Sequence, residues 1–533
     1  MLADVFLKFN QGRYRILHLT WFAFFLSFVV WFNFAPFKST VQADLGLTEA
    51  QVRTILICNV ALTVPARVII GMLLDKYGPR LTYSVLLMFA AIPCTTFALA
   101  QDFSHLVLSR LALSIVGAGF VIGIRMTAEW FPPKEIGLAE GIYGGWGNFG
   151  SAAAAFSLPV IAAWLSFGAI NPATGDPMLN WRLAIGGTGI IAAIYGLIYF
   201  FNAEDTPPGK VYQRPRSARG LEVTTKRDFW FLMLMNAPLS GILMLLAWRL
   251  MKVKFYDQNT MYIVWLALLG LYAFQAYNCW TVNKDLLAGR KRYPAEDRYN
   301  FSQVAILELT YIVNFGSELA IVSMLPNFFE QTFSLSVAQA GMIASSYAFM
   351  NLVSRPGGGL ISDSLGSRKQ TMAILTFGMG IGYLLMSTVS SNWWLPGAVM
   401  LTMACSFFVQ AAEGSTFAIV PLIKRRVTGQ IAGNVGAYGN VGAVAYLTIF
   451  SLLPIWIGGE AEPTTATLIQ ANTTFFQVLG VASLIVAFLC WFVLKEPKGS
   501  FAEHHEGEVS ELEPAFTPAH SSTTSSDESA RLY

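Results

Sequence analysis

Two arginines, Arg67 and Arg355, stand inside long apolar runs of the sequence. An arginine in membrane hydrocarbon costs at least ~2.5–3.5 kcal/mol on insertion scales, so its presence there is informative. Each arginine opens the same five-residue pattern, and the two copies are 288 residues apart at every position. The copies are Arg67, Gly71, Asp75, Gly78 and Arg80, and Arg355, Gly359, Asp363, Gly366 and Arg368. Two arginines at equivalent positions of two repeats predict one site that is built from two halves.

A second repeated pattern is rich in glycine and holds one asparagine in each copy. It consists of Gly141, Gly145, Gly147, Asn148 and Gly150, and returns 292 residues later as Gly433, Ala437, Gly439, Asn440 and Gly442. On a helix, Gly141, Gly145 and Asn148 share one face, where glycine lets a neighbouring helix approach closely. Simple helix packing, with Asn148 bonding between helices, is the alternative to a binding role. The two repeats together indicate a duplicated transporter.

The elements that must hold these residues are long apolar helices. The chain has 533 residues, of which 54% are hydrophobic and 13% charged, and its mean hydropathy is +0.52. Soluble proteins carry about 25% charged residues, whereas apolar runs of about 20 residues, long enough to span a membrane, recur throughout this chain. The expected fold class is therefore an all-α polytopic membrane protein. A closed barrel is excluded because the sequence lacks short alternating strands.

About fourteen apolar segments divide into two sets of six, with two extra segments between them. The first six lie near 16–37, 51–74, 81–101, 104–131, 138–167 and 183–201, the extra pair near 229–250 and 260–281, and the last six near 303–327, 339–361, 371–390, 395–422, 430–458 and 475–494. We expect an N-terminus (1–15), two six-helix halves (16–201 and 303–494), a central region of basic linkers with the extra segments (202–302) and a disordered acidic tail (495–533).

Charge placement predicts the orientation of the chain. Basic residues recur at every second connection, and the intervening loop near 459–474 has none. Because lysine and arginine gather in cytoplasmic loops, both termini are expected on the cytoplasmic side of the cell membrane. Lys252 and Lys254, on the opposite side, weaken this pattern locally. The five cysteines fall in apolar runs and are expected to be buried and unpaired. No cofactor is expected, and the histidines of the tail have no spacing that closes a metal site.

The loop pattern around Asp75 and Arg80, repeated at Asp363 and Arg368, resembles the loop motif of the major facilitator superfamily. The glycine patterns narrow this resemblance to the nitrate/nitrite porter family, whose fifth and eleventh helices carry a Gly-rich signature with a Gly-Asn pair. The matching segments are Ala139-Glu-Gly-Ile-Tyr-Gly-Gly-Trp-Gly-Asn148-Phe-Gly150 and Gly433-Asn-Val-Gly-Ala-Tyr-Gly-Asn440-Val-Gly442, with Ala437 as the departure at a glycine position. The resemblance implies the major facilitator fold of two pseudo-symmetric halves, with the charged loop residues as gates.

The resemblance also implies what the arginines do. Arg67 on the second helix and Arg355 on the eighth match the family's two substrate-binding arginines, and each precedes its loop glycine by eleven residues. Nitrate is a planar, singly charged anion, and a planar guanidinium offers paired donors to two of its oxygens. Asn148 and Asn440 are expected beside the same anion. The alternative is that each arginine is neutralised by a buried carboxylate.

An aromatic platform is expected next to the arginines. Tyr311 and Phe315 stand one turn apart on the seventh helix, and the resembled family carries a tyrosine and a phenylalanine at this spacing beside the substrate. A ring face can stack on the planar anion only if the arginine charges outweigh the ring quadrupole. Ordinary core packing is the alternative for this pair. Phe120 on the fourth helix is a weaker candidate.

The further ionisable residues inside apolar runs include Arg125, Glu129, Glu318 and Glu413. Arg125 and Glu129 have the spacing of an ion pair within one helix. Arg125 and Glu413 hold equivalent positions of the two repeats, so a pair across the halves is the alternative. Glu318 and Glu413 are candidates for proton coupling, and a gating or solvent-lining role is the alternative for Glu318.

These patterns and the resemblance predict a secondary active transporter that moves nitrate and nitrite by alternating access, with proton-coupled uptake as the favoured mode. A nitrate/nitrite exchanger needs no proton path and is one alternative, and a membrane sensor that binds nitrate without moving it is another. An enzyme is excluded because the sequence holds no phosphate loop, zinc-ligand or haem motif. The expected partners are nitrate, nitrite, protons and the lipid bilayer, with a monomer as the functional unit and no nucleic acid.

Overall fold

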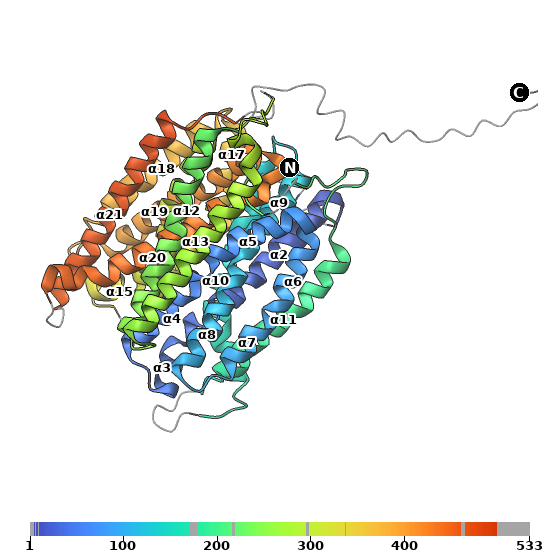
Figure 1. Ribbon diagram of the computed structural model, residues 1–533. Coiled ribbons are helices and arrows are strands. Elements are labelled where there is room, and N and C mark those ends of the chain that lie inside the picture. Colours follow the sequence, from blue (N-terminus) through green and yellow to red (C-terminus); the bar gives the residue numbers. More distant parts are fainter. Residues whose placement is uncertain are drawn as a thin grey trace, which may run out of the picture.

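The structure is a computed structural model that describes residues 5, 7, 8, 10–170, 178–215, 219–294, 298–335, 337–459 and 464–497. The described chain is a bundle of long helices, with both ends at the same end of the bundle (Figure 1). The predicted all-α fold with fourteen helical segments is confirmed. Most of the predicted acidic tail, from residue 498 onward, lies outside the described residues.

The first six segments form one half of the bundle, coloured blue to teal in Figure 1. They are α2 (Gly12–Phe32) with η1 (Ala35–Phe37) and α3 (Lys38–Leu45), α4 (Glu49–Ala61) with α5 (Thr63–Tyr77), α6 (Pro79–Phe89) with α7 (Ala91–Ala98), α8 (Phe103–Ser114) with η2 (Ile115–Ala118) and α9 (Gly119–Trp130), α10 (Ile136–Trp164), and α11 (Trp181–Asn202). The short 3₁₀ turn η2 interrupts the fourth segment. Such a break frees backbone carbonyls from the helical ladder for other partners.

The last six segments form the other half. They are α14 (Phe301–Tyr311) with η4 (Ile312–Gly316) and α15 (Ser317–Phe333), α16 (Val337–Phe349) with α17 (Asn351–Ser364), α18 (Arg368–Met386), α19 (Leu395–Ile423), η5 (Arg425–Val427) with α20 (Thr428–Gly458), and α21 (Thr465–Phe492). The turn η4 is π-helical and interrupts the seventh segment. Turns of this kind are frequent at functional sites.

The two extra segments are the long helices α12 (Lys226–Lys252) and α13 (Gln258–Leu287). They lie side by side, drawn in green across the front of Figure 1. Thr225 caps the N-terminus of α12, because its hydroxyl accepts a hydrogen bond from the Asp228 amide at 3.1 Å. Asp257 caps α13 in the same way, with its carboxylate accepting from the Thr260 amide at 3.1 Å. α12 contacts α4 of the first half and both α14 and α20 of the second. The extra pair is therefore packed across the boundary between the halves.

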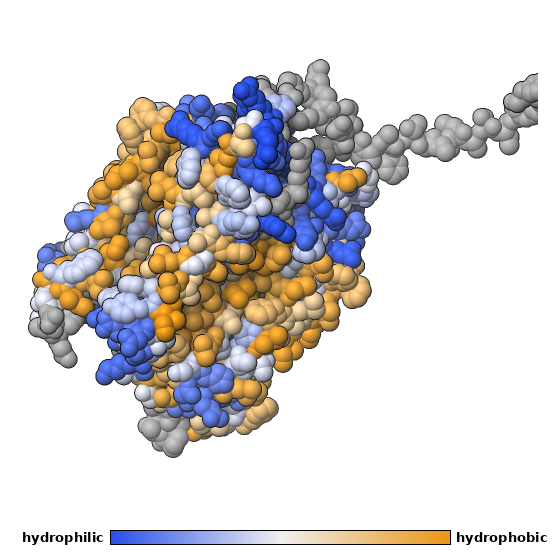
Figure 2. Space-filling model, in the orientation of Figure 1, coloured by the Kyte–Doolittle hydropathy of each residue, from blue (hydrophilic) through white to orange (hydrophobic). Residues whose placement is uncertain are grey.

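The surface has the form expected of a multi-pass membrane protein. Apolar residues cover a broad band across the middle of the face in Figure 2, and hydrophilic residues gather toward its two ends. Eleven of the fourteen described segments are long and apolar enough to span a membrane by length and composition. The segments outside that count are α10, α16 with α17, and α18. The glycine pattern lies on α10 and the arginine pattern on α17, and their small and charged residues lower the hydropathy of these segments.

Two seams join the halves, and each is lined by glycine. α10 packs against α17 at one seam, and α20 packs against α5 at the other. A Cβ added to Gly141 would lie 2.6 Å from the Arg355 carbonyl oxygen, and one added to Gly433 would lie 2.6 Å from the Arg67 carbonyl oxygen. These distances leave no room for a side chain, so the helices touch backbone to backbone. The arginines thus lie on helices that approach the other half very closely.

One aspartate closes the end of each seam. Asp75 accepts hydrogen bonds at 3.0 Å from the first amides of α20, Gly429 N and Gln430 N. Asp363 accepts in the same way from the first amides of α10. A carboxylate stabilises a helix N-terminus by satisfying its free amides and the positive end of its dipole. Each half therefore anchors a helix of the other half, at the end of the bundle where the N-terminus lies.

Candidate substrate-binding site

Arg67 lies on α5 with its side chain fully buried. Its Nε donates to the Gly117 carbonyl at 3.2 Å, and its Nη1 donates to the Gly436 carbonyl at 2.6 Å. The Tyr311 hydroxyl is close to the guanidinium as well, yet Nη2 has no hydrogen-bond partner among the described residues. No carboxylate of the described chain forms an ion pair with Arg67. The two N–H groups of Nη2, and a positive charge without an ion-pair partner among the described residues, are therefore left for a ligand.

The two carbonyls reach Arg67 because of local backbone features. Gly117 belongs to the 3₁₀ turn η2, where the helical ladder is broken. Gly436 belongs to α20, and a Cβ there would lie 3.1 Å from the Arg67 Cδ. The Gly436 carbonyl also accepts from Asn440 Nδ2 at 3.3 Å. Asn440 therefore acts on Arg67 through the backbone atom that both contact.

Arg355 lies on α17 and is equally buried, but its partners differ. Its Nη1 forms an ion pair of 2.5 Å with Glu413 Oε2 on α19, and its Nη2 donates to the Tyr311 hydroxyl at 3.1 Å. The equivalent of Gly436 in the first half is Gly144, where a Cβ would lie 2.6 Å from Arg355 Nε. The alternative of a buried carboxylate partner thus holds for Arg355 and fails for Arg67 among the described residues.

Phe120 connects the two arginines. The guanidinium carbons of Arg67 and Arg355 each lie 5.2 Å from the centre of the Phe120 ring. That distance is within the range of a cation–π contact. The Phe120 ring is also nearly parallel to that of Tyr311, with centroids 6.0 Å apart and 8° between planes. Phe120, a weaker candidate from the sequence, therefore lies at the centre of the arginine pair.

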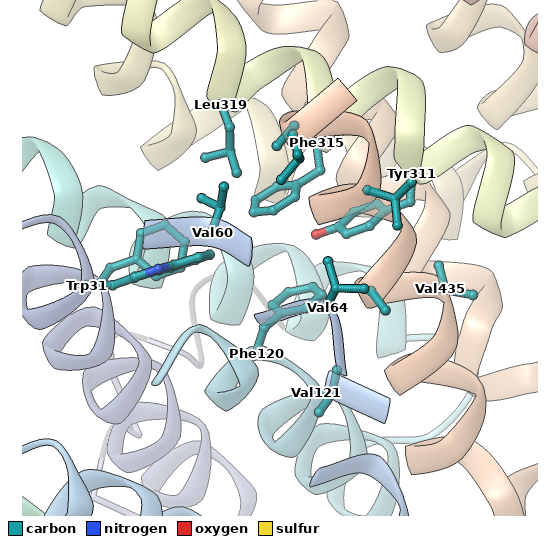
Figure 3. Packing of buried hydrophobic residues seen from close by; sticks show 14 of the residues in the cluster. Trp31, Val60, Val64, Phe120, Val121, Tyr311, Phe315, Leu319 and Val435 are labelled. Carbon is teal, nitrogen blue, oxygen red and sulfur yellow. The ribbon is translucent and has the colours of Figure 1, made fainter. Parts of the chain in front are cut away.

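Tyr311 and Phe315, predicted as an aromatic platform, lie together beside Arg67. Their rings are parallel within 1° with centroids 5.0 Å apart, and Phe315 lies 5.1 Å from the Arg67 guanidinium carbon. Figure 3 shows the rings of Phe120, Tyr311 and Phe315 gathered between the two halves. The π-helical turn η4 contains Phe315 and follows Tyr311 directly. Phe417 of α19 packs edge-on against both Phe120 and Tyr311 and is a member of this cluster that sequence reasoning missed.

Glu318 lies beside the Arg355–Glu413 pair. Its Oε1 accepts from Asn351 Nδ2 at 2.6 Å and from Gln410 Nε2 at 3.3 Å. Its carboxyl group also reaches that of Glu413 closely enough to hydrogen-bond if one of them carries a proton. Glu318 is 4% exposed and Glu413 is 0% exposed, so water does not solvate this pair. The structure therefore brings both predicted carboxylates to the same arginine.

Arg125 does not pair with Glu413, so that alternative from the repeat alignment is wrong. Arg125 Nη2 binds Glu129 at 2.9 Å within α9, as the spacing of the two residues allows, and Arg125 Nε lies 3.9 Å from Asp75. Lys210 also binds Glu129, at 2.8 Å. The carboxylate one turn along the same helix is closer than one in the other half. Arg125 therefore belongs to the charged cluster around Asp75 and not to the cluster around Arg67 and Arg355.

The two charged loops, around Asp75 and Asp363, are less alike in structure than in sequence. Arg368 binds Asp363 at 2.7 Å. Arg80 instead stacks on Phe200 with its guanidinium carbon 4.6 Å from the ring centre, and its amide donates to Asp205 at 2.7 Å. Burial raises the pKa of Asp205, which lies in the linker after α11, outside the spanning helices. The aspartate–arginine pair is therefore present in one copy of the motif, while Asp75 takes Arg125 in the other.

The remaining signature residues pack the helices. Asn148 is 3% exposed, and its Oδ1 has no hydrogen-bond partner among the described residues. A Cβ on Gly439 would lie 2.6 Å from the Tyr311 ring, and one on Gly442 would lie 2.6 Å from the Ile312 carbonyl oxygen. Gly145 meets the carbonyl of Asn351, and Gly147 and Gly150 meet α2. Gly144 and Gly436, which touch the arginine side chains, lie inside the two glycine-rich segments but were not among the predicted signature positions.

The other expectations concern cysteines and metals. All five cysteines are buried and unpaired. No cluster of three or more metal-ligating side chains occurs within the described ranges. The tail histidines fall outside those ranges.

Comparison with known proteins places this arrangement in a family. Residues 20–286 and 307–524 match the family model described as Major Facilitator Superfamily. The chain belongs to this superfamily. Superfamily structures share the fold at low identity: a double-tryptophan mutant of XylE aligns with a TM-score of 0.62 and 14% identity, over 92% of this chain and 97% of that one.

Sequence relatives narrow the assignment to the nitrate/nitrite porter family. The chain is 68% identical over 525 residues to the nitrate/nitrite transporter NrtP of Picosynechococcus sp., covering 96% of this chain and 97% of the relative. It is 57% identical to the NrtP of Nostoc punctiforme over 94% of this chain and 96% of the relative. A nitrate/nitrite antiporter of Thermus thermophilus, described as probable and named NarK1, is 23% identical over 92% of the chain. The chain is thus a multi-pass membrane protein of a family of transporters rather than enzymes.

Proposed function

We propose that this chain carries nitrate and nitrite across the cell membrane by alternating access, in the direction of uptake and coupled to protons. The observation that carries the proposal is Arg67, a fully buried cation with a free donor and no carboxylate partner in the described chain. A buried charge without compensation is strongly unfavourable, so such a site attracts an anion. The relatives named as nitrate/nitrite transporters identify the class of anion.

The shape of the site favours a small planar anion. The Phe120 ring lies 5.2 Å from each guanidinium carbon, and the Tyr311 and Phe315 rings stand parallel to each other beside it. Flat ring faces and planar guanidinium forks match a flat ligand better than a tetrahedral one such as phosphate. Asn148, which has a free Oδ1, and Asn440, which acts through Gly436, support the site from the two signature helices.

The proposed mode of transport is inferred from the division of the site between the two halves. Each arginine comes from one half, so rocking of the halves about the site exposes it to one side of the membrane and then the other. The aspartates Asp75 and Asp363 hold the seams closed at the end where the N-terminus lies, with Arg80 and Arg368 in the same loops. We assign that end to the cytoplasm because its loops are the basic ones. The unit of transport is the monomer, since both arginines lie in one chain.

Counterflow in proteoliposomes tests the proposal. Purified full-length protein is reconstituted, and labelled nitrate entry is followed with and without an inward proton gradient. Proton-coupled uptake predicts accumulation that depends on the gradient, whereas an exchanger predicts nitrite-driven nitrate entry that is unaffected by it. Binding of nitrate without any flux would identify a sensor. Absence of both binding and flux for nitrate and nitrite would overturn the proposed function.

A further inference from the structure

The charge of the site is unequal between its two halves. Arg355 is balanced by Glu413 at 2.5 Å, whereas Arg67 donates to two uncharged carbonyls. Both side chains are buried, so neither charge is screened by water. An incoming anion is therefore drawn to Arg67 first. It gains Arg355 as a second ligand only by competing with Glu413 for the same guanidinium.

Glu413 cannot simply leave Arg355 as a bare carboxylate. Apart from the ion pair with Arg355, neither of its oxygens accepts a hydrogen bond from the described residues, and the other group that it contacts is a second carboxyl group, that of Glu318. A buried carboxylate without a cation or donor is costly, and two carboxylates in contact repel each other unless one carries a proton. Displacement of Glu413 from Arg355 therefore requires that a proton binds to it.

Resting on the proposed function, we infer that Glu413 is the coupling residue: the anion replaces it at Arg355 as Glu413 takes up a proton. The proton comes from water on the side to which the site is open and forms an O–H bond at a Glu413 carboxylate oxygen. The ion pair with Arg355 breaks, Arg355 Nη1 donates to an oxygen of the anion, and no covalent bond of the anion changes. One anion and one proton enter together, so the net charge of the site is the same when it is empty and when it is loaded.

Glu318 has a supporting role in this step. Asn351 and Gln410 hold its Oε1, so its carboxyl group stays in place while that of Glu413 changes partner. The other titratable or charged groups near this pair are Arg67 of α5, Tyr311 of α14, Glu140 of α10, Tyr347 of α16 and Tyr383 of α18. Glu140 is held by Thr127, and the tyrosines stay neutral near pH 7 because a phenol ordinarily titrates near pH 10. Glu413 is the carboxylate in direct contact with a substrate arginine.

The test compares nitrate binding and transport by the wild type and by Glu413→Gln. Equilibrium binding of labelled nitrate to the purified full-length chain is measured between pH 5.5 and pH 8. Uptake of one proton with each anion predicts wild-type affinity that weakens by about ten-fold per pH unit. Glu413→Gln leaves Arg355 without its competitor, so it is expected to bind nitrate with little dependence on pH and more tightly than the wild type at pH 8.

Transport by the same variant gives the second readout. Glu413→Gln in proteoliposomes is expected to retain nitrate/nitrite counterflow and to lose accumulation driven by a proton gradient. The matched control is Glu308→Gln, which removes a buried carboxylate of the same half that contacts neither arginine. The control should keep the wild-type pH dependence. Glu413→Asp, which keeps a carboxylate, should keep it as well and serves if the glutamine variant fails to fold.

Three results would overturn the inference. Gradient-driven accumulation by Glu413→Gln would show that the proton is carried elsewhere. Loss of nitrate binding by a folded Glu413→Gln would show that the carboxylate only positions Arg355. Wild-type counterflow with pH-independent binding would reject proton coupling while leaving the transport of nitrate and nitrite standing, and absence of any wild-type flux would instead reject the proposed function itself.

Discussion

Arg67 and Arg355 hold equivalent positions in the two halves, and the surroundings of the two side chains are alike in backbone and unlike in charge. Each arginine rests against a glycine of the facing signature helix, Gly436 or Gly144, and each lies near Phe120. Arg355 has Glu413 as a full counter-charge, and Arg67 has only carbonyl dipoles. The two repeats thus share the backbone geometry around the arginines and differ in the charge that faces each guanidinium.

The largest effect on nitrate uptake is expected when either arginine is replaced by lysine, whose ammonium group takes the place of the guanidinium. Arg67→Lys keeps the charge and loses the fork, and charge-assisted hydrogen bonds contribute about 1.5–3 kcal/mol each. Loss of two such bonds predicts nitrate uptake lower by at least ~100-fold. Arg355→Lys is also expected to lose most uptake. Initial rates of labelled nitrate entry, normalised to the amount of inserted protein, measure both, and near wild-type rates for either would contradict a direct ligand role.

Adding a methyl group beside each arginine separates the two sides. Gly144→Ala would place Cβ 2.6 Å from Arg355 Nε, whereas Gly436→Ala would place it 3.1 Å from Arg67 Cδ. Overpacking costs about 1–3 kcal/mol, so Gly144→Ala should lower uptake by roughly ten-fold or more and Gly436→Ala by less. Gly357→Ala on α17, where the nearest atom lies at 3.9 Å, is the control. Equal losses for all three would reject the contact as the cause.

Removing the shared ring should affect both arginines together. Phe120→Leu abolishes two cation–π contacts, each of about 0.5–2 kcal/mol and together about 1–4 kcal/mol, so the KM for nitrate should rise by roughly five-fold or more. Phe328→Leu, which removes a buried ring that packs on Phe329 and Phe476, is the control. A changed maximal rate with an unchanged KM would place Phe120 in the conformational change and not in binding.

The smallest expected effect is on stability and concerns Glu222, in the linker that precedes α12. Burial alone would raise the pKa of Glu222, but hydrogen bonds from Lys291 and Tyr293 and the charge of Arg426 outweigh it and lower that pKa overall. A lowered pKa adds stability above the unfolded value, about 4.3, and that stability is lost as pH falls through the folded value. Glu222→Gln should therefore lower the unfolding temperature slightly at pH 7. The same difference at pH 4 would contradict this origin.

The sequence carried enough information to predict the fold and the arginine pair. Apolar length and the two constant offsets identified fourteen segments and the duplicated halves, because both depend only on spacing along the chain. The partner of Arg355 was not predictable in this way. Glu129 and Glu413 were both available as buried carboxylates, and the rotation of each helix about its axis decides which cation a carboxylate faces.

Most of the other contacts that were not predicted from the sequence depend on features of the backbone. The carbonyls that bind Arg67 come from a 3₁₀ turn and from a glycine of another helix, and neither has a signal in residue type alone. Phe417 reads as one more apolar residue of a spanning segment. Gly144 and Gly436 could have been found, since they stand 292 residues apart as the other signature glycines do.

The position of α12 has a consequence for how the bilayer acts on this protein. α12 lies against α4, α14 and α20, and α13 lies outside it with only 6% of its apolar window buried. Acyl chains on that side therefore touch α13 and meet α12 before they reach the boundary between the halves. Changes in lipid composition or thickness therefore act on the α5–α20 seam through this layer of protein and not directly.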